Sequence, residues 1–237
     1  MSISSSSSRL IEYLKRHGIG ATLRRAMLAA NRAIFAGRMA VFFCDLDDRK
    51  LRQVNLPAGM KLQRITAPAQ LSPHHLQDMV NVWNPKLATQ DIQERFEHGA
   101  SLWLVESEGQ LAGYGWTIQG KTIAPYYFPL GPGDVQLFDF FVFTKFRGRA
   151  LHWLLTGYIL HTLAVEGSAR AYADTGEWNQ PQLASFKMTP LRFLGLARSF
   201  KIFDHVFTYW DTNEPAAWKQ KSTARAERAA KVLRSNE

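Results

Sequence analysis

One segment of the chain combines residue types that could bind a phosphate-bearing ligand. An apolar strand predicted at residues 135–143 runs into a basic loop, Lys145 to Arg149, with Gly148 inside it. A helix is expected to open at Arg149 and Ala150. The first turn of a helix leaves N–H groups unsatisfied and carries the positive end of the helix dipole, so it favours phosphate. Gly148 would let the backbone approach such a ligand closely, and the segment therefore predicts a pyrophosphate-binding turn.

This turn differs from two other phosphate-binding motifs. It has no Gly-Lys-Ser/Thr sequence, which a nucleoside-triphosphate P-loop requires. It also lacks the three spaced glycines of a dinucleotide-binding turn. The pattern therefore indicates a phosphate-bearing ligand of another kind.

The strand, loop and helix resemble the signature of the GNAT acyltransferases, an apolar strand followed by Val-x-Pro-x-x-Arg-Gly-x-Gly/Ala and a helix. The matching residues here are Val142, Arg147, Gly148 and Ala150, and Thr144 stands where proline is usual. Upstream, residues 104–115 look like the second and third strands of the family. Downstream, Asn179, Ser185 and residues 193–196 are similar to its Asn, Ser/Ala and Lys-Leu-Gly-Phe series. The resemblance covers residues 61–210.

The resemblance implies that acetyl-CoA or another acyl-CoA is a co-substrate, held where the fourth and fifth strands splay apart. Backbone groups of residues 141–143 would bind the pantetheine arm, and N–H groups of residues 146–150 would hold the pyrophosphate. Asn179 and Ser185 would face the same ligand. The donor-binding residues implied in this way are Phe141, Val142, Phe143, Lys145, Phe146, Arg147, Gly148, Arg149, Ala150, Asn179 and Ser185.

The implied reaction is attack of an amine on the thioester carbonyl, assisted by a base and by an amide that stabilises the oxyanion. Asp139 is the candidate base, since it is a lone carboxylate among Leu, Phe and Val, where burial would raise its pKa. The alternative is that Asp139 pairs with a strand neighbour or a lysine. Gln136 occupies the position where some family members keep a catalytic Glu, and no Tyr follows Asn179 on the next helix.

The function expected is therefore N-acylation, most simply N-acetylation, of a primary amine. A small molecule or an amino sugar is favoured over a protein as the acceptor. The alternative from another class is a GNAT-like domain that binds acyl-CoA or a protein partner without catalysis. Turnover with any amine would exclude this alternative.

The remaining patterns predict the elements that position this segment. Helices are expected at residues 72–83, 89–98 and 179–187. Strands are expected at residues 39–44, 61–65, 102–106, 111–118, 169–174, 200–203 and 206–210. The resulting fold class is α+β, a mixed and mostly antiparallel central sheet of six or seven strands flanked by helices, with helical N- and C-terminal extensions.

Charge divides the chain into three parts. Residues 1–39 form a Ser-rich start and basic helices, residues 40–212 the GNAT-like domain, and residues 213–237 a basic helix or tail. The net charge of +9 comes from the two ends, which makes nucleic acid an unlikely partner for the neutral middle. The basic amphipathic helix at residues 20–36 could lie on an anionic membrane or pack on its own domain.

The sequence contains one cysteine, Cys44, so no disulfide within the chain and no multi-cysteine zinc site can form. His74 and His75 point apart on a helix, and no metal is expected there. A reducing, cytoplasmic location is predicted, with peripheral membrane contact through the N-terminal helix as an addition. The oligomeric state is left open, a homodimer included.

Overall fold

A computed structural model describes residues 38–46, 51, 53–82, 84–123, 126–202 and 205–212. Of the extensions predicted at residues 1–39 and 213–237, all but Arg38 and Met39 lie outside the described residues, and Met39 belongs to a strand. Within the described residues, no helix has the length and apolar character needed to span a membrane.

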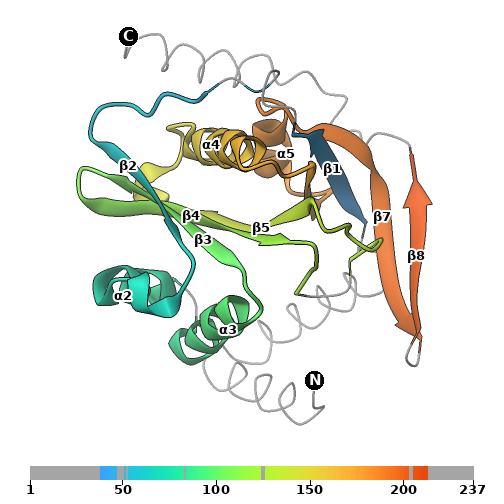
Figure 1. Cartoon of the computed structure of the whole chain (residues 1–237), viewed down its shortest axis with the longest axis horizontal. Helices are drawn as coiled ribbons and strands as arrows, with labels where there is room; N and C mark the ends of the chain where they lie inside the picture. The colour runs from blue at the N-terminus through green and yellow to red at the C-terminus, as the bar shows by residue number, and fades with distance from the viewer. Residues whose placement is uncertain are drawn as a thin grey trace, which may run out of the picture. The chain divides into compact units, whose positions relative to one another are not determined.

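The described residues form one α+β unit around a single sheet (Figure 1). Its eight strands exceed the predicted six or seven, and they lie in the order β2-β3-β4-β5-β6-β1-β7-β8. All neighbours pair antiparallel except β5 and β6, which are parallel. The strands are β1 (Met39–Asp45), β2 (Met60–Ile65), β3 (Ser101–Ser107), β4 (Gln110–Gln119), β5 (Asp134–Val142), β6 (Arg170–Gly176), β7 (Arg192–Ile202) and β8 (His205–Asp211). The mixed, mostly antiparallel sheet is as predicted.

Helices cover both faces of the central strands. α2 (Pro73–Asn81) and α3 (Pro85–Glu97) pack on one face, and α4 (Leu151–Val165) and α5 (Gln180–Phe186) on the other (Figure 1). Two short 3₁₀ turns, η1 (Pro68–Gln70) and η2 (Thr144–Phe146), complete the elements. Because Asn84 caps α3 and Pro85 opens it, this helix begins before the predicted Thr89.

The first strand of the sequence lies deep in the sheet. β1 pairs with β6 on one side and with β7 on the other, and Ala40, Val41 and Phe42 are fully buried. β7 starts at Arg192 instead of the predicted Phe200, since its first half pairs with β1 and its second half with β8. β1 therefore fixes the position of β6, one of the two parallel strands.

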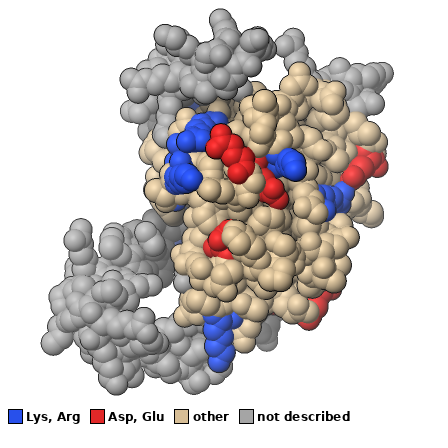
Figure 2. Space-filling view, turned by 90° about the vertical axis from the view of Figure 1, so that its left-hand side faces the viewer, with Lys and Arg blue, Asp and Glu red and all other residues tan. Residues whose placement is uncertain are grey.

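One side of the molecule shows a mixed distribution of charge. In Figure 2, Lys and Arg side chains lie beside Asp and Glu side chains on the described part of this face. On the described part of this face, charges of both signs therefore lie close together.

Candidate functional site

The two parallel strands part halfway along their length. β5 and β6 pair from Asp134 with Arg170 up to Leu137 with Ala173, and no further. Beyond this point Phe138, Phe141 and Val142 stay paired with β4, while residues 174–176 stay paired with β1. Each strand therefore keeps its outer neighbour, and a gap opens between the two inner edges. Side chains from both strands, α4 and α5 line this gap.

An ion pair closes the other end of the parallel strands. Asp134 is buried, and its carboxylate accepts from Arg170 Nε at 2.9 Å and Nη2 at 3.3 Å. The N–H of Gly131 donates to the same carboxylate at 2.9 Å. The charge of Asp134 is therefore compensated, and the strands are held together at the end away from the gap.

A bulge on β5 sits at the mouth of the gap. The register with β4 shifts between Tyr114 and Trp116, and Asp139 has a left-handed backbone with φ of 48°. A bulge rotates the strand and changes the direction of its side chains. Phe140 accordingly packs with the α4 face, whereas Phe138 and Phe141 pack with the α2–α3 face.

The basic loop follows β5 as predicted, but its helix begins later. α4 starts at Leu151, and Ala150 is its N-cap residue with φ of 57°. The N–H groups of Phe146 and Arg147 already donate to Phe143 and Thr144 within η2. In the described structure no hydrogen bond is made by the N–H groups of residues 148–150, so these groups are the ones left for an anion. The predicted contribution of Phe146 and Arg147 N–H groups is therefore corrected.

Gly148 lies at the open side of this loop. Its φ is 83°, and no atom lies within 4 Å of a Cβ placed on it. The neighbouring cations are exposed and turned along the protein: Lys145 donates to Gln110 Oε1 at 2.7 Å, and Arg147 donates to the Val142 carbonyl at 3.2 Å. Arg149 stacks over Phe146 at 5.4 Å. Three cationic residues therefore flank these N–H groups in the chain, while their side chains contact other parts of the protein.

The backbone of the predicted pantetheine-binding residues is partly engaged elsewhere. The N–H of Phe143 donates to Ala112 and its carbonyl accepts from Phe146, so the predicted role of Phe143 rests on groups already bonded within the protein. Phe141 and Val142 pair with Tyr114 and Gly113 of β4 on one edge. Their opposite edge faces the gap, where β6 no longer pairs with β5.

Ser185 and Asn179 form bonds within the protein. Ser185 Oγ lies 2.8 Å from His152 Nδ1, which joins α5 to the first turn of α4. Asn179 caps α5, and its amide donates to Gln182 Oε1 at 3.0 Å. Burial lowers the pKa of His152 to about 4, and its Nε2 is buried with no hydrogen-bond partner among the described residues. The rings of Phe140 and Phe186, which line the gap, lie 5.2 and 5.6 Å away.

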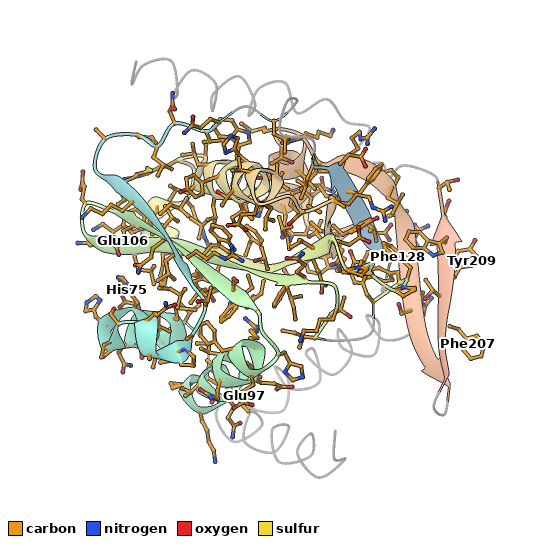
Figure 3. The ribbon with its side chains drawn as sticks, in the orientation of Figure 1. His75, Glu97, Glu106, Phe128, Phe207 and Tyr209 are labelled. Atoms are coloured by element: carbon orange, nitrogen blue, oxygen red, sulfur yellow. The ribbon has the colours of Figure 1, made fainter. Side chains whose placement is uncertain are left out.

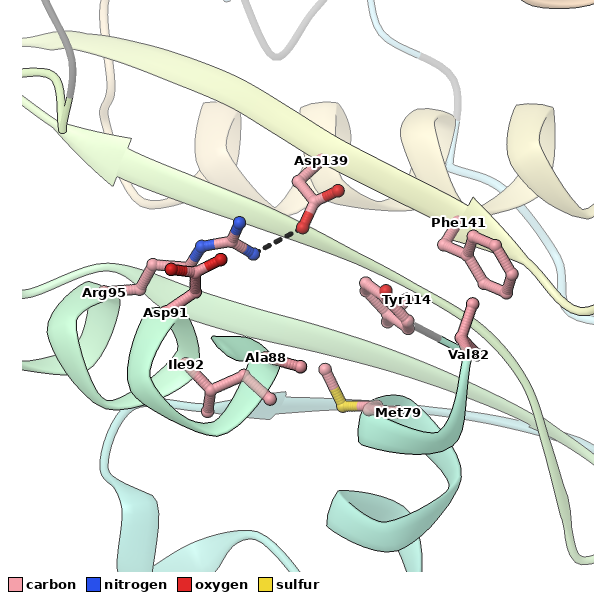
Figure 4. Close-up of a pocket in the computed structure, with 9 residues that line it drawn as sticks. All are labelled: Met79, Val82, Ala88, Asp91, Ile92, Arg95, Tyr114, Asp139 and Phe141. Carbon is pink, nitrogen blue, oxygen red and sulfur yellow. Dashed lines mark hydrogen bonds and ion pairs between the residues drawn. The ribbon is translucent and has the colours of Figure 1, made fainter. Parts of the chain in front are cut away.

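A pocket of about 370 Å³ lies on the opposite face of β5, between the sheet and α2 and α3 (Figure 4). Its walls are mainly apolar, with three charged side chains. The residues that line it are Met79, Val82, Ala88, Asp91, Ile92, Arg95, Tyr114, Asp139 and Phe141. Asp139 also lines the gap between β5 and β6, so the bulge connects the two spaces.

Asp139 differs from its predicted environment. Its side chain is 44% exposed and forms an ion pair with Arg95 of α3, drawn in Figure 4. The expectation of burial is wrong, because the bulge turns the residue out of the apolar alternation of the strand. The carboxylate does pair, but with an arginine of α3 and not with the strand neighbour or lysine of the predicted alternative. A catalytic role for Asp139 stays a prediction.

A second carboxylate lies in the gap. Asp174 of β6 is partly buried, and it accepts a hydrogen bond of 3.2 Å from the hydroxyl of Tyr127. Burial raises its pKa from 3.8 to about 6, against the opposing effect of the Tyr127 bond. Tyr126 lies beside this pair, and its hydroxyl is buried with no partner among the described residues. Burial and the nearby Asp174 raise the pKa of Tyr126 well above 10.

The loop that supplies these tyrosines is anchored by aromatic packing. Phe128 lies against β7 and β8 in Figure 3, and its ring is 5.0 Å from Tyr172 and 6.0 Å from Trp210. Tyr127 packs against Trp210 at 5.9 Å. This aromatic loop therefore lies away from the pocket between the sheet and α2 and α3.

Sequence reasoning missed three residues of the site, namely Asp174, His152 and Arg95. One signal was present: Asp174 follows Ala171, Tyr172 and Ala173 on a predicted strand, the same pattern that selected Asp139. The other two depend on contacts between residues far apart in the chain. His74 and His75 pair separately, with Asp78 at 3.3 Å and with Glu106 at 3.4 Å (Figure 3).

The residues present fit an acyl-CoA. The open loop of residues 148–150 with its cationic neighbours suits a pyrophosphate, and the edge of β5 that is unpaired beyond Leu137 would offer backbone groups to an extended chain. The unpartnered Nε2 of His152 would offer this chain a polar contact beside the gap. A CoA thioester supplies an activated acyl carbonyl, and the protein must place an amine against it.

No protein-family model and no curated protein matches the sequence. Solved structures do match. A tandem GNAT protein from the clavulanic acid biosynthesis pathway is similar over 77% of this chain and 57% of its own, with a TM-score of 0.50 and 19% identity. A GNAT-family acetyltransferase from Colwellia psychrerythraea matches over 66% of this chain and 53% of its own, with a TM-score of 0.49 and 13% identity.

A GCN5-related N-acetyltransferase from Sphaerobacter thermophilus matches 74% of this chain and 54% of its own, with a TM-score of 0.48 and 12% identity. This chain therefore spans little more than half the length of each of these proteins. The tandem GNAT protein, the parting of β5 and β6 and the loop after β5 agree on the architecture. The described part of the chain has the GNAT fold.

Proposed function

We propose that this protein is an acyl-CoA-dependent N-acyltransferase that transfers an acetyl or related acyl group to a primary amine. The observation that carries the proposal is the connection between two spaces through one bulge. The gap between β5 and β6 leads to the basic loop, the pocket between the sheet and α2 and α3 lies on the other face, and Asp139 borders both. A donor in the gap and an acceptor in the pocket would meet at this residue.

The donor site rests on main-chain geometry. The N–H groups of residues 148–150 have no partner in the described structure, and Lys145, Arg147 and Arg149 are exposed in or beside the same loop. The parted strands expose the inner edge of β5 to a ligand arm. Backbone N–H groups at this edge are also suited to stabilise a developing oxyanion.

The pocket supports a small acceptor with an apolar body. Its volume of about 370 Å³ lies in the range of small-molecule sites. Met79, Ile92 and Phe141 supply apolar contact area, while Asp91 and Asp139 outnumber Arg95 and favour a cationic group. We propose that the acceptor is a primary amine attached to an aliphatic or aromatic group, with its nitrogen directed toward Asp139.

The test is thiol release from acetyl-CoA by the full chain in the presence of primary amines of increasing apolar size. The only protein thiol, Cys44, is buried and burial raises its pKa to about 11, so a thiol reagent reports the released CoA. We expect turnover that increases with the apolar size of the amine until the pocket is filled, and none with tertiary amines. Binding of acetyl-CoA without turnover of any amine would favour the non-catalytic alternative.

A further inference from the structure

The carboxylate of Asp174 lies in the gap where the transferred group would be placed. It lines the gap together with Leu137, Asp139 and Phe140 of β5, directly beyond the last parallel pair of Leu137 and Ala173. β1 holds its backbone in place, since Asp174 is paired with the buried Val41. The position of the carboxylate is therefore fixed by the sheet and not by a mobile loop.

The partner of Asp174 comes from a separate segment. Tyr127 donates its hydroxyl proton to Asp174 Oδ2 at 3.2 Å, and the ring of Tyr127 is packed against Trp210. One carboxylate oxygen is thereby occupied. In the described structure no hydrogen bond or ion pair is made by Oδ1, so this oxygen is left for a proton.

We propose that Asp174 is the general base of the transfer and that Tyr127 is its positioning residue. This inference rests on the proposed function. The amine nitrogen forms a C–N bond with the thioester carbonyl carbon and the C–S bond breaks. The proton lost by nitrogen passes to Asp174 and then to the thiolate sulfur, so that amine and thioester become amide and thiol with the carboxylate regenerated.

The two carboxylates of the gap have different environments. Asp139 is exposed and ion-paired with Arg95, whereas Asp174 is enclosed and has no cationic partner in the described structure. Burial raises the pKa of Asp174 to about 6, which suits a base at neutral pH because it is ionised and still holds a proton well. Two acids held in such different surroundings take different roles.

Few other groups titrate near Asp174. The titratable side chains that face it in the described structure are Asp139 across the gap, Tyr126 and Tyr127 from the loop, and Tyr172 on its own strand. α5 and β1 contribute the uncharged Gln182 and Val41. α4 contributes Thr156 and, behind Phe140 and Phe186, His152, whose pKa is lowered by burial to about 4. An activity change near pH 6 is therefore assigned to Asp174, and substitution of Asp139 tests this assignment against the other carboxylate of the gap.

The experiment compares pH profiles of kcat for the wild type, Asp174→Asn, Asp139→Asn and Tyr127→Phe. For the wild type we expect activity to fall as the pH drops through about 6. Asp174→Asn should lower kcat about 100-fold or more at neutral pH and lose this acid limb, with the KM for acetyl-CoA little changed. Asp139→Asn should keep the limb at the same pH.

Tyr127→Phe tests the positioning role through the pH at which activity falls, because the loss of a merely structural contact would not change this pH. Its hydrogen bond lowers the pKa of Asp174, so removing the hydroxyl should shift the acid limb to higher pH. This variant removes one oxygen atom and keeps the proposal testable should Asp174→Asn not fold. Compared with Asp174→Asn, Asp174→Glu should recover part of the activity and the acid limb of the pH profile.

The outcomes distinguish a failure of Asp174 as the general base from a failure of the proposed acyltransferase function. Retention of the acid limb in Asp174→Asn together with its loss in Asp139→Asn overturns the proposal while leaving the acyltransferase activity in place. An unshifted limb in Tyr127→Phe overturns the positioning role. Absence of both acetyl-CoA binding and turnover in the wild type overturns the proposed function, and with it this inference.

Discussion

At the scale of residues, the site depends on where the sheet places single polar groups. Asp139 and Asp174 lie on facing strands, yet a bulge exposes the first and the strand order encloses the second. His152 shows the same dependence. It occupies the first turn of α4, where α5 and Phe140 exclude water from its ring.

The enclosed imidazole of His152 predicts a change in acid stability. Its pKa falls from 6.5 to about 4 on folding, so the unfolded chain binds the proton more tightly. This group contributes stability above pH 6.5 that is lost as the pH falls toward 4, by up to about 3 kcal/mol. His152→Asn keeps a partner for Ser185 and should lose less stability over this range.

The measurement is the free energy of unfolding in urea at pH 7, 6, 5 and 4 for both proteins. The two proteins are compared by the slope of the free energy of unfolding against pH, because the smaller asparagine side chain lowers stability at every pH. Parallel curves for the wild type and His152→Asn would show that His152 is not held in its uncharged form.

How far the sequence predicts the site can be judged residue by residue. The loop at Gly148 was predicted correctly because its motif is local: a strand, a turn and a helix follow each other within 20 residues or so. The exposure of Asp139 was not predicted, because the alternation of apolar and polar residues along a strand does not reveal a bulge. The pairs of His152 with Ser185 and Tyr127 with Asp174 join segments whose proximity only the fold determines.

At the scale of elements, the parallel strands have one clamped end and one open end. Asp134 and Arg170 hold β5 and β6 together at the first pair of the register. Four pairs later the strands part toward different outer neighbours. Local patterns predicted both strands, but the parallel pairing and the place of β1 between β6 and β7 depend on contacts that no local pattern records.

The ion pair between Asp134 and Arg170 predicts a large loss of stability when the arginine is replaced, although its side chain is half exposed. Arg170→Gln would leave the carboxylate of Asp134, which is 5% exposed, without its counter-charge. We expect the free energy of unfolding to fall by about 2–3 kcal/mol, somewhat less than for a fully buried pair. Arg192→Gln is the matched control, since its pair with Asp45 is exposed on both sides and should cost less than about 1 kcal/mol.

Urea unfolding of both variants at one pH and ionic strength checks this expectation. Equal losses in the free energy of unfolding for Arg170→Gln and Arg192→Gln would mean that the pair of Asp134 and Arg170 contributes no more than a surface ion pair. The parting of the strands would then be determined by β1 and β4 alone.

At the scale of the whole described unit, the proposed donor and acceptor sites lie on different surfaces of β5. One edge and the loop after it suit the acyl donor, and the face toward α2 and α3 suits the acceptor. The fold class was predicted correctly from the order of elements around one loop, and the sheet has one strand more than expected. The acceptor pocket was not predicted, because its lining is drawn from four elements and the bulge.

The central claim is that the loop after β5 binds the pyrophosphate of an acyl-CoA. The most direct measurement is a calorimetric titration of the full chain with acetyl-CoA for the wild type, Gly148→Glu and Gly167→Glu. Both glycines have φ near +83° and open space at Cβ, so both substitutions carry the same backbone strain. Only the first places a carboxylate beside the free N–H groups of the loop.

We predict saturable binding by the wild type, a loss of affinity of at least about tenfold, or 1.4 kcal/mol, for Gly148→Glu, and an affinity near that of the wild type for Gly167→Glu. Equal affinities for all three proteins would place the donor elsewhere. No binding by the wild type would contradict the account as a whole.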